Sequence, residues 1–155
     1  MSKSQIMENQ TNSIKKPSMR KKARKYAVQG IYQWQLSGNP INDIEFQFLE
    51  TINSKKVDVV YFQEILVNCL TSITEIDDLL APNVTRDLSE VNPVELAVLR
   101  LACYELKNRI DVPYKVVINE ALELTKIFGA EEGHKFVNGV LDKMAKEIRP
   151  TETSK

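Results

Sequence analysis

The chain has 155 residues, which is enough for one domain with a substantial core, and its apolar content of 43% argues against wholesale disorder. Its 21 basic and 21 acidic residues cancel, so a uniformly basic or acidic protein is excluded. No apolar run approaches the roughly 20 residues that a membrane span needs, and the N-terminus lacks the apolar core of a signal peptide.

The neutral total hides a polarised distribution of charge. Residues 1–25 hold eight bases and one acid, a charge of +7, whereas the remaining 130 residues carry −7. A basic end attached to an acidic body indicates an anionic partner.

The first expected element follows a polar segment. Residues 1–17 are poor in apolar side chains and end at Pro17, so we expect a flexible N-terminal extension there. Ser18 is the predicted N-cap of a helix that ends at Gly38. The apolar positions that give this helix a buried face are Ala23, Ala27, Ile31 and Trp34.

Two further helical segments follow. The first is predicted over residues 42–52, and the second over residues 57–80 with Asp58 as its cap. The expected buried positions of this second segment include Val60. Its hydroxyl-rich stretch at 71–74 is expected to bend or split the helix, because these side chains compete for backbone hydrogen-bond partners.

The C-terminal half begins with a strong helix-start signal, Asn92 followed by Pro93. The helix that follows is apolar nearly all round, so we expect it to be buried at the centre. Two more helices are predicted over 113–128 and 133–148, and residues 151–155 are expected to be a disordered tail. Six to seven helices with no strand candidate predict an all-α domain, a compact bundle over residues 18–150.

Catalytic and metal-binding signatures are missing from the sequence. There is no phosphate-cradling glycine loop, and His134 is the one histidine. The two cysteines, Cys69 and Cys103, lie in apolar helical patterns, which indicates buried thiols in a reducing compartment. We therefore expect a cytoplasmic protein that is not an enzyme and has no metal or cofactor. Arg100 lies in the most apolar helix, where we expect an ion pair with Glu120 or Glu105.

The basic cluster at the start of the first helix is the candidate binding site. Cations in the first two turns oppose the helix dipole at a cost of up to ~1 kcal/mol each, so five of them there suggest a functional role. Free backbone amides and basic side chains together bind phosphate well. Lys21, Lys25 and Tyr32 share a helical face, a pattern that suits single-stranded nucleic acid. A merely solubilising tail is the alternative, and charge alone does not separate RNA from DNA.

Four blocks of the sequence resemble the NusB family of transcription antitermination factors. They are RKKARKYAVQGIYQWQLS at 20–37, VELAVLRLACYEL at 94–106, DVPYKVVINEALEL at 111–124 and FGAEEGHKFVNGVLDK at 128–143. The resemblance implies two small helical sub-bundles and binding to boxA of nascent ribosomal RNA together with NusE, a small-subunit ribosomal protein. It also implies an indirect action on the RNA polymerase elongation complex, which then reads through terminators, and no catalysed reaction.

The resemblance also implies positions for the contacts. For RNA the basic motif gives Arg20, Lys21, Lys22, Arg24 and Lys25, and the region near the last helix gives Phe128, Glu132 and Phe136. Lys115 and Lys135 could add phosphate contacts. For NusE they are Tyr32, Glu90 and Glu95. Phe128 and Phe136 could equally be core residues, and Glu95 could simply complete the capping box at Asn92.

Other interpretations remain open at this point. A helical protein–protein adaptor with nonspecific RNA affinity would predict no preference for boxA. The fold also resembles the RNA-binding part of ribosomal-RNA cytosine methyltransferases, but these need a downstream cofactor domain that we do not expect in a chain ending at Lys155. A homodimer is possible. Under the RNA-binding hypothesis, Arg20→Ala with Arg24→Ala is expected to weaken RNA binding and leave the fold intact.

Overall fold

This computed structural model describes residues 16–129 and 132–154 of the chain. These residues contain eight α-helices and two short 3-10 helices. In chain order they are α2 (Lys16–Ser37), α3 (Ile41–Thr51), α4 (Val59–Thr71), α5 (Ile73–Leu80), η1 (Ala81–Asn83), η2 (Leu88–Glu90), α6 (Pro93–Asn108), α7 (Tyr114–Phe128), α8 (Gly133–Ile148) and α9 (Pro150–Thr153). The described residues contain no strand, so the all-α prediction is confirmed.

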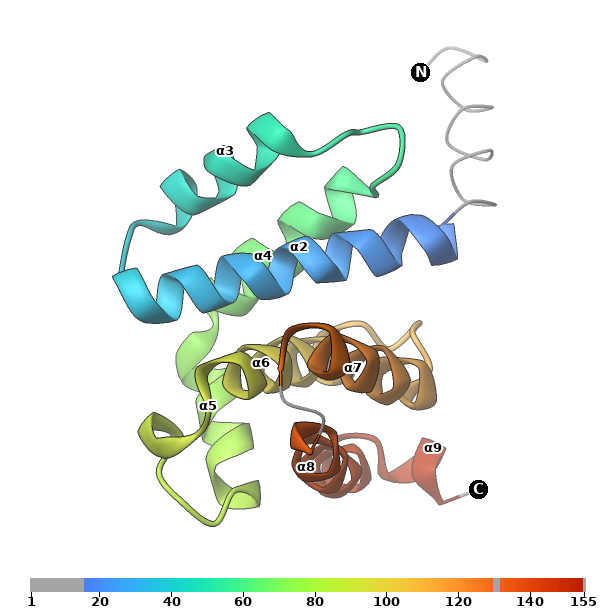
Figure 1. Cartoon of the computed structure of the whole chain (residues 1–155). Helices are drawn as coiled ribbons and strands as arrows, with labels where there is room; N and C mark the ends of the chain where they lie inside the picture. Colours follow the sequence, from blue (N-terminus) through green and yellow to red (C-terminus); the bar gives the residue numbers. More distant parts are fainter. Residues whose placement is uncertain (1–15, 130–131, 155) are drawn as a thin grey trace.

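The helices form two sub-bundles, as expected (Figure 1). Helices α2, α3 and α4 pack together in one, and α5 to α8 pack together in the other. Helix α2 belongs to both arrangements, because it packs on α4 within its own sub-bundle and on α6 across the boundary. The basic helix therefore lies where the two halves of the molecule meet.

Local signals set three of the helix ends where they were predicted. The Asp58 carboxylate accepts a hydrogen bond from the Tyr61 amide at 3.1 Å at the start of α4. The Asn92 side chain accepts from the Val94 amide at 2.9 Å at the start of α6. Gly38 ends α2 with a φ of +67°, a conformation that a residue without Cβ adopts at little cost.

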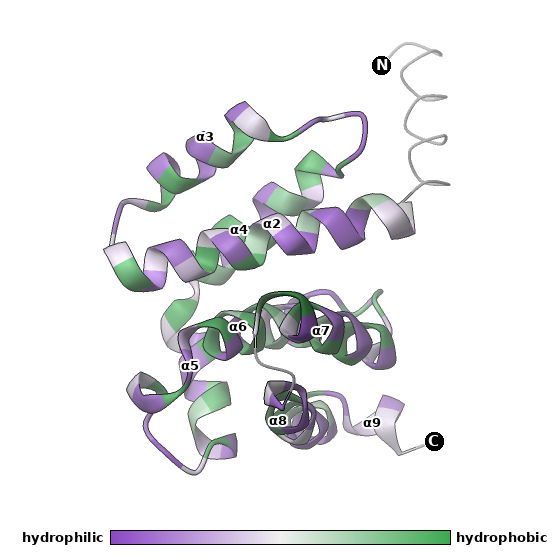
Figure 2. Cartoon of the chain, in the orientation of Figure 1, coloured by the Kyte–Doolittle hydropathy of each residue, from purple (hydrophilic) through white to green (hydrophobic). Residues whose placement is uncertain are grey.

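The core is centred on α6, where eleven of sixteen residues are buried. Figure 2 shows green, hydrophobic stretches along α4 and α6, whereas the N-terminal half of α2 carries the purple of hydrophilic residues. Cys69 and Cys103 are both buried free thiols, as predicted. The predicted break in the long segment is also confirmed, because α4 ends at Thr71 and α5 begins at Ile73.

Four structural expectations need correction. Helix α2 starts at Lys16, so Ser18 is inside it and is not its cap; Pro17 fits a first turn because the amide it lacks would have no helical partner there. Val60 is 76% exposed and contributes nothing to the core. Arg100 pairs with Asp77, its Nη2 donating at 2.9 Å, and not with Glu120 or Glu105.

The fourth correction concerns the C-terminal tail, which forms the short helix α9 where disorder was expected. The Glu152 carboxylate anchors it by accepting from the Tyr114 amide at 2.8 Å and from Arg149 at 3.1 Å. The flexible extension was predicted over residues 1–17. Residues 1–15 lie outside the described part of the chain, and Lys16 and Pro17 are the first two residues of α2.

Candidate nucleic-acid interface

The basic motif occupies the second and third turns of α2, because Arg20 is the fifth residue of that helix. The motif therefore lies beyond the first turn, where a helix leaves amides without helical partners, and the expected combination of such amides with all five bases is not formed. What remains is a patch of side-chain charge. Lys21, Lys22 and Lys25 are exposed, whereas Arg20 is half-buried and Arg24 is buried.

Arg24 is part of the core. Its Nε donates to Glu105 Oε1 and its Nη2 to Glu105 Oε2, both at 2.9 Å, and the Tyr61 hydroxyl donates to the same carboxylate. Burial by itself lowers the pKa of Arg24, but the hydrogen bonds and charge of Glu105 outweigh it and leave the pKa raised. Two of the guanidinium nitrogens bond Glu105 of α6 and the side chain is buried, so the structure does not support an RNA contact by Arg24.

Arg20 lies on an aromatic platform next to this pair. Its guanidinium carbon is 4.3 Å from the centroid of the Tyr61 ring, which Arg109 also approaches at 4.9 Å. The nearest carboxylate oxygens belong to Asp58 at 3.8 Å and Asp111 at 4.0 Å, outside hydrogen-bonding distance. Arg20 is thus held by stacking on Tyr61 and by two ion pairs that are too long for hydrogen bonds, at the edge of the exposed patch.

The three exposed lysines differ in their surroundings. Lys21 Nζ lies 2.5 Å from Glu123 Oε2 and 3.4 Å from Glu120 Oε2, both on α7. The hydrogen bond to Glu123 is the main reason that the pKa of Lys21 is raised. Lys22 and Lys25 form no ion pair with any residue that the structure describes. They are the most available cations of the motif.

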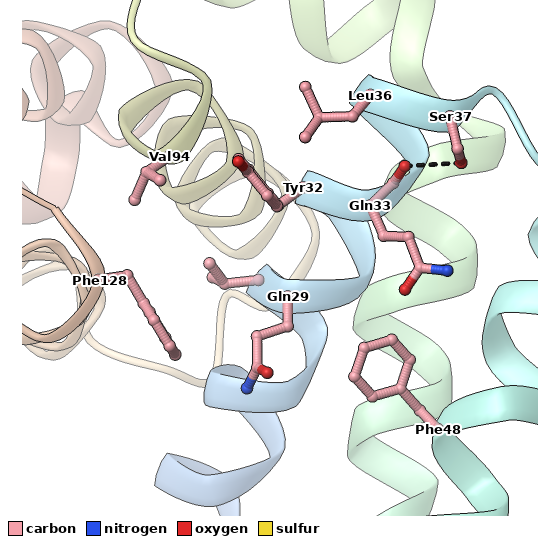
Figure 3. Close-up of a pocket in the computed structure, with 9 residues that line it drawn as sticks. Gln29, Tyr32, Gln33, Leu36, Ser37, Phe48, Val94 and Phe128 are labelled. Carbon is pink, nitrogen blue, oxygen red and sulfur yellow. Dashed lines mark hydrogen bonds between the residues drawn. The ribbon is translucent and has the colours of Figure 1, made fainter.

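An apolar groove opens further along α2 (Figure 3). It has a volume of about 560 Å³ and lies between the C-terminal half of α2, Phe48 of α3, Val94 of α6 and Phe128 at the end of α7. Tyr32, which is 36% exposed, points from α2 into this groove toward Val94. Phe128 is half-buried on the opposite wall. Two residues predicted to contact different partners therefore line one groove.

Three further predicted RNA contacts lie at the start of α8. Phe136 is half-buried, and Glu132 and Lys135 are exposed. The Arg86 guanidinium lies over the Phe136 ring, 4.7 Å from its centroid. Sequence reasoning missed Arg86 because it precedes α6 in a connecting segment and carries no motif; an isolated arginine beside Asp87 gives no signal of its own.

The remaining predicted contacts lie apart. Lys115 is exposed in the first turn of α7, and Glu90 is exposed on η2. Glu95, by contrast, is only 8% exposed. Its carboxyl carbon lies 3.1 Å from the place that a Cβ on Gly133 would occupy, so it fills the space between the starts of α6 and α8. A direct NusE contact by Glu95 is therefore not supported by the structure.

The described residues contain no group of three or more His, Cys, Asp or Glu side chains that could hold a metal ion. None of the helices in the described ranges is both long and apolar enough to cross a membrane. The chemistry available at this surface is that of cations, two half-buried aromatic rings and an apolar groove.

The sequence is similar to a known protein family over most of its length. The model of the NusB family matches residues 21–146. The transcription antitermination protein NusB of Shewanella pealeana is 59% identical over 83% of this chain and 96% of its own length, and that of Sodalis glossinidius is 56% identical over 87% and 97%.

Solved structures show the same similarity. NusB of T. maritima superposes with a TM-score of 0.76 at 28% identity, covering 88% of this chain and 97% of that one. A chain in a crystal structure of the antitermination factors NusB and NusE in complex with dsRNA gives 0.71 at 27% identity, covering 82% and 96%. With most of its length matched by the family model and by these relatives, the chain belongs to the NusB family of transcription antitermination proteins.

Proposed function

We propose that this protein acts in the cytoplasm by binding boxA of nascent ribosomal RNA together with NusE. The complex then helps RNA polymerase read through terminators, and the protein catalyses no reaction. The observation that carries the proposal is the set of exposed lysines on α2, placed on a chain of the NusB family whose relative was crystallised with NusE and RNA. Lys22 and Lys25 in particular face solvent and have no carboxylate to neutralise them among the described residues.

The seam between α2 and α7 suggests a path for the RNA. At one end Lys21 meets Glu120 and Glu123 of α7, and at the other end the groove brings Phe128 of α7 opposite Tyr32 of α2. Phosphates would bind the lysines as simple point charges, without the paired geometry that arginine offers. The half-buried ring of Phe128 leaves an accessible side on which an unstacked base can pack.

A second aromatic position supports base contacts. Phe136 has one face covered by the Arg86 guanidinium, so a base would stack on the outer side of that guanidinium. A base stacked there would place its phosphate close to Lys135, which is exposed one residue earlier on α8. The phosphate contacts position the RNA, and the base contacts supply preference for one sequence.

For NusE we propose the α2 wall of this groove, around Tyr32, which faces the Phe128 wall that the RNA path uses. The groove is apolar and its volume of about 560 Å³ is sufficient for side chains of a protein partner. Tyr32 gives an aromatic anchor with a polar tip, a residue type enriched at interfaces. Glu90, exposed on η2, does not line the groove and would be a separate charged contact.

The test compares a boxA RNA with a scrambled RNA of equal length, each at two salt concentrations, with and without NusE. We expect tighter binding to boxA and a further gain when NusE is present. Equal binding to both RNAs at both salt concentrations, with no response to NusE, would contradict the proposal and leave a helical adaptor with sequence-independent affinity.

A further inference from the structure

We infer that Glu123, supported by Glu120, is a built-in competitor of RNA for Lys21, which limits the sequence-independent part of RNA binding. The inference rests on the proposed function, because it assumes that Lys21 meets phosphate. It adds acidic residues of α7 to a surface that was otherwise defined by its bases.

The geometry places the Glu123 carboxylate where a phosphate would have to bind. Glu123 Oε2 lies 2.5 Å from Lys21 Nζ, well within reach of a charge-assisted hydrogen bond. A phosphate oxygen cannot occupy the same position, so RNA must displace Glu123 or approach Lys21 from another side. The lysine is in this way already neutralised before any ligand arrives.

The pair is nevertheless exchangeable. The side chains of Lys21 and Glu123 are 49% and 59% exposed, and ion pairs in such surroundings contribute little to stability. Nothing buries the contact against water, in contrast to the neighbouring pair of Arg24 and Glu105. RNA can therefore replace Glu123 at a modest cost, and no change of fold is required.

Glu120 and Glu123 have different roles in this arrangement. The Glu120 side chain is only 19% exposed, and the nearby charge of Arg24 acts on it as well as that of Lys21. When Lys21 turns to a phosphate, Glu120 keeps the attraction of a buried guanidinium. Glu123 loses its hydrogen-bonded partner and must recover a cation from solution, which makes Glu123 the residue whose removal is informative.

The salt dependence of binding follows from this exchange. A lysine that meets phosphate normally contributes to cation release, with a slope of about 0.7 in log K against log salt for a single strand. If Glu123 takes up a cation at the same time, part of that release is cancelled. Glu123 thereby lowers the contribution of phosphate contacts to the binding free energy, so the base contacts supply a larger share of it.

The decisive variant is Glu123→Gln, measured with boxA RNA and with scrambled RNA at two salt concentrations. We expect about a two- to five-fold gain in affinity, the size typical of an exposed ion pair. The gain should be equal for the two RNAs, because a phosphate contact carries no sequence information. The salt slope should become steeper by up to about 0.7.

Two controls separate this contact from a general change of charge. Glu50→Gln removes one negative charge from the exposed surface of α3 and should leave RNA affinity within the error of the measurement. In a Lys21→Gln background, Glu123→Gln should have no effect. A gain that persists in that background, or that Glu50→Gln reproduces, would overturn the inference.

The scrambled RNA keeps this test independent of the proposed function. Absence of boxA preference in the unaltered protein counts against the proposed function, whereas the effect of Glu123→Gln on scrambled RNA is measured regardless of that preference. A selective loss of boxA binding in Glu123→Gln would also overturn the inference, because it would mean that the carboxylate contacts a base.

Discussion

Arg24 and Glu105 form a bidentate ion pair in which the side chains are 5% and 2% exposed. Arg24 comes from α2 and Glu105 from α6, so the pair crosses the boundary between the two sub-bundles. One arginine of a motif that resembles an RNA-binding sequence is therefore a structural link, and the lysines next to it face solvent.

Replacement of Arg24 should affect the fold more than RNA binding. Arg24→Ala leaves the Glu105 carboxylate buried without its cation, a change that typically costs about 3–5 kcal/mol. The free energy of unfolding, measured by urea denaturation, should fall by that amount. The exposed neighbour Lys25→Ala is the control and should change it by no more than about 0.5 kcal/mol.

The same reasoning corrects the expectation for the double variant Arg20→Ala with Arg24→Ala, which cannot be assumed to leave the fold intact. Replacing both members of the pair, Arg24→Met with Glu105→Met, should recover part of the stability, because no charge is then buried alone. An unfolding free energy for Arg24→Ala equal to that of the unaltered protein would show that the pair contributes no stability.

The exposed lysines give a cleaner test of RNA binding. Lys22→Ala with Lys25→Ala should weaken binding to boxA and scrambled RNA alike and reduce the salt slope by about 1.4, two phosphate contacts at about 0.7 each. The matched control is Lys55→Ala with Lys56→Ala, which removes the same charge from the exposed segment before α4. Equal effects of the two double variants would mean that net charge, and not the α2 surface, governs affinity.

The groove predicts a separation of partner binding from RNA binding. Tyr32→Ala removes the aromatic ring that points into the groove, so affinity for NusE should fall by at least ten-fold in calorimetric titration, as for an aromatic anchor. RNA affinity measured without NusE should stay within two-fold. Glu95→Ala is the contrasting variant, for which we expect lower stability because it empties the space that the Glu95 side chain fills beside Gly133.

The buried thiols predict a pH dependence of stability. Burial raises the pKa of Cys103 from its ordinary value of 9.0 to about 12, and burial also raises that of Cys69. Above pH 9 the unfolded chain loses these protons while the folded chain keeps them, so the unfolding free energy should fall as the pH rises from about 9 toward 12.

A substitution checks the assignment of that pH effect. Cys103→Ala should reduce the slope of unfolding free energy against pH by about 1.4 kcal/mol per pH unit within this window. A thiol reagent at pH 8 should label neither cysteine until the protein is unfolded. Rapid labelling of the folded protein would contradict the burial of both side chains.

The helices were predictable because their ends depend on neighbours in sequence. Gly38, Asp58 and Asn92 act on amides or dihedral angles within a few residues, and all three ended or began helices where expected. Helix α9 was not predictable in this way, since the contact between Glu152 and the Tyr114 amide joins residues far apart in the chain.

The exposure and the partners of the candidate site residues could be predicted only in part. Arg24 and Lys25 are adjacent bases on one helix, and only Glu105, 81 residues later, determines that the first is buried. Arg100 was expected to find an acid and did, but packing of α5 on α6 made it Asp77. Which carboxylate a base meets is a property of the packed helices and leaves no local pattern.

Helix α2 contributes to the apolar packing of both sub-bundles, since it packs on α4 of one and on α6 of the other. Neither half can lose it without exposing its own apolar surface, so the two should melt as one cooperative unit. A ligand that binds the lysines of α2 would then slow amide hydrogen exchange throughout α4 and α6, well beyond the side chains it touches.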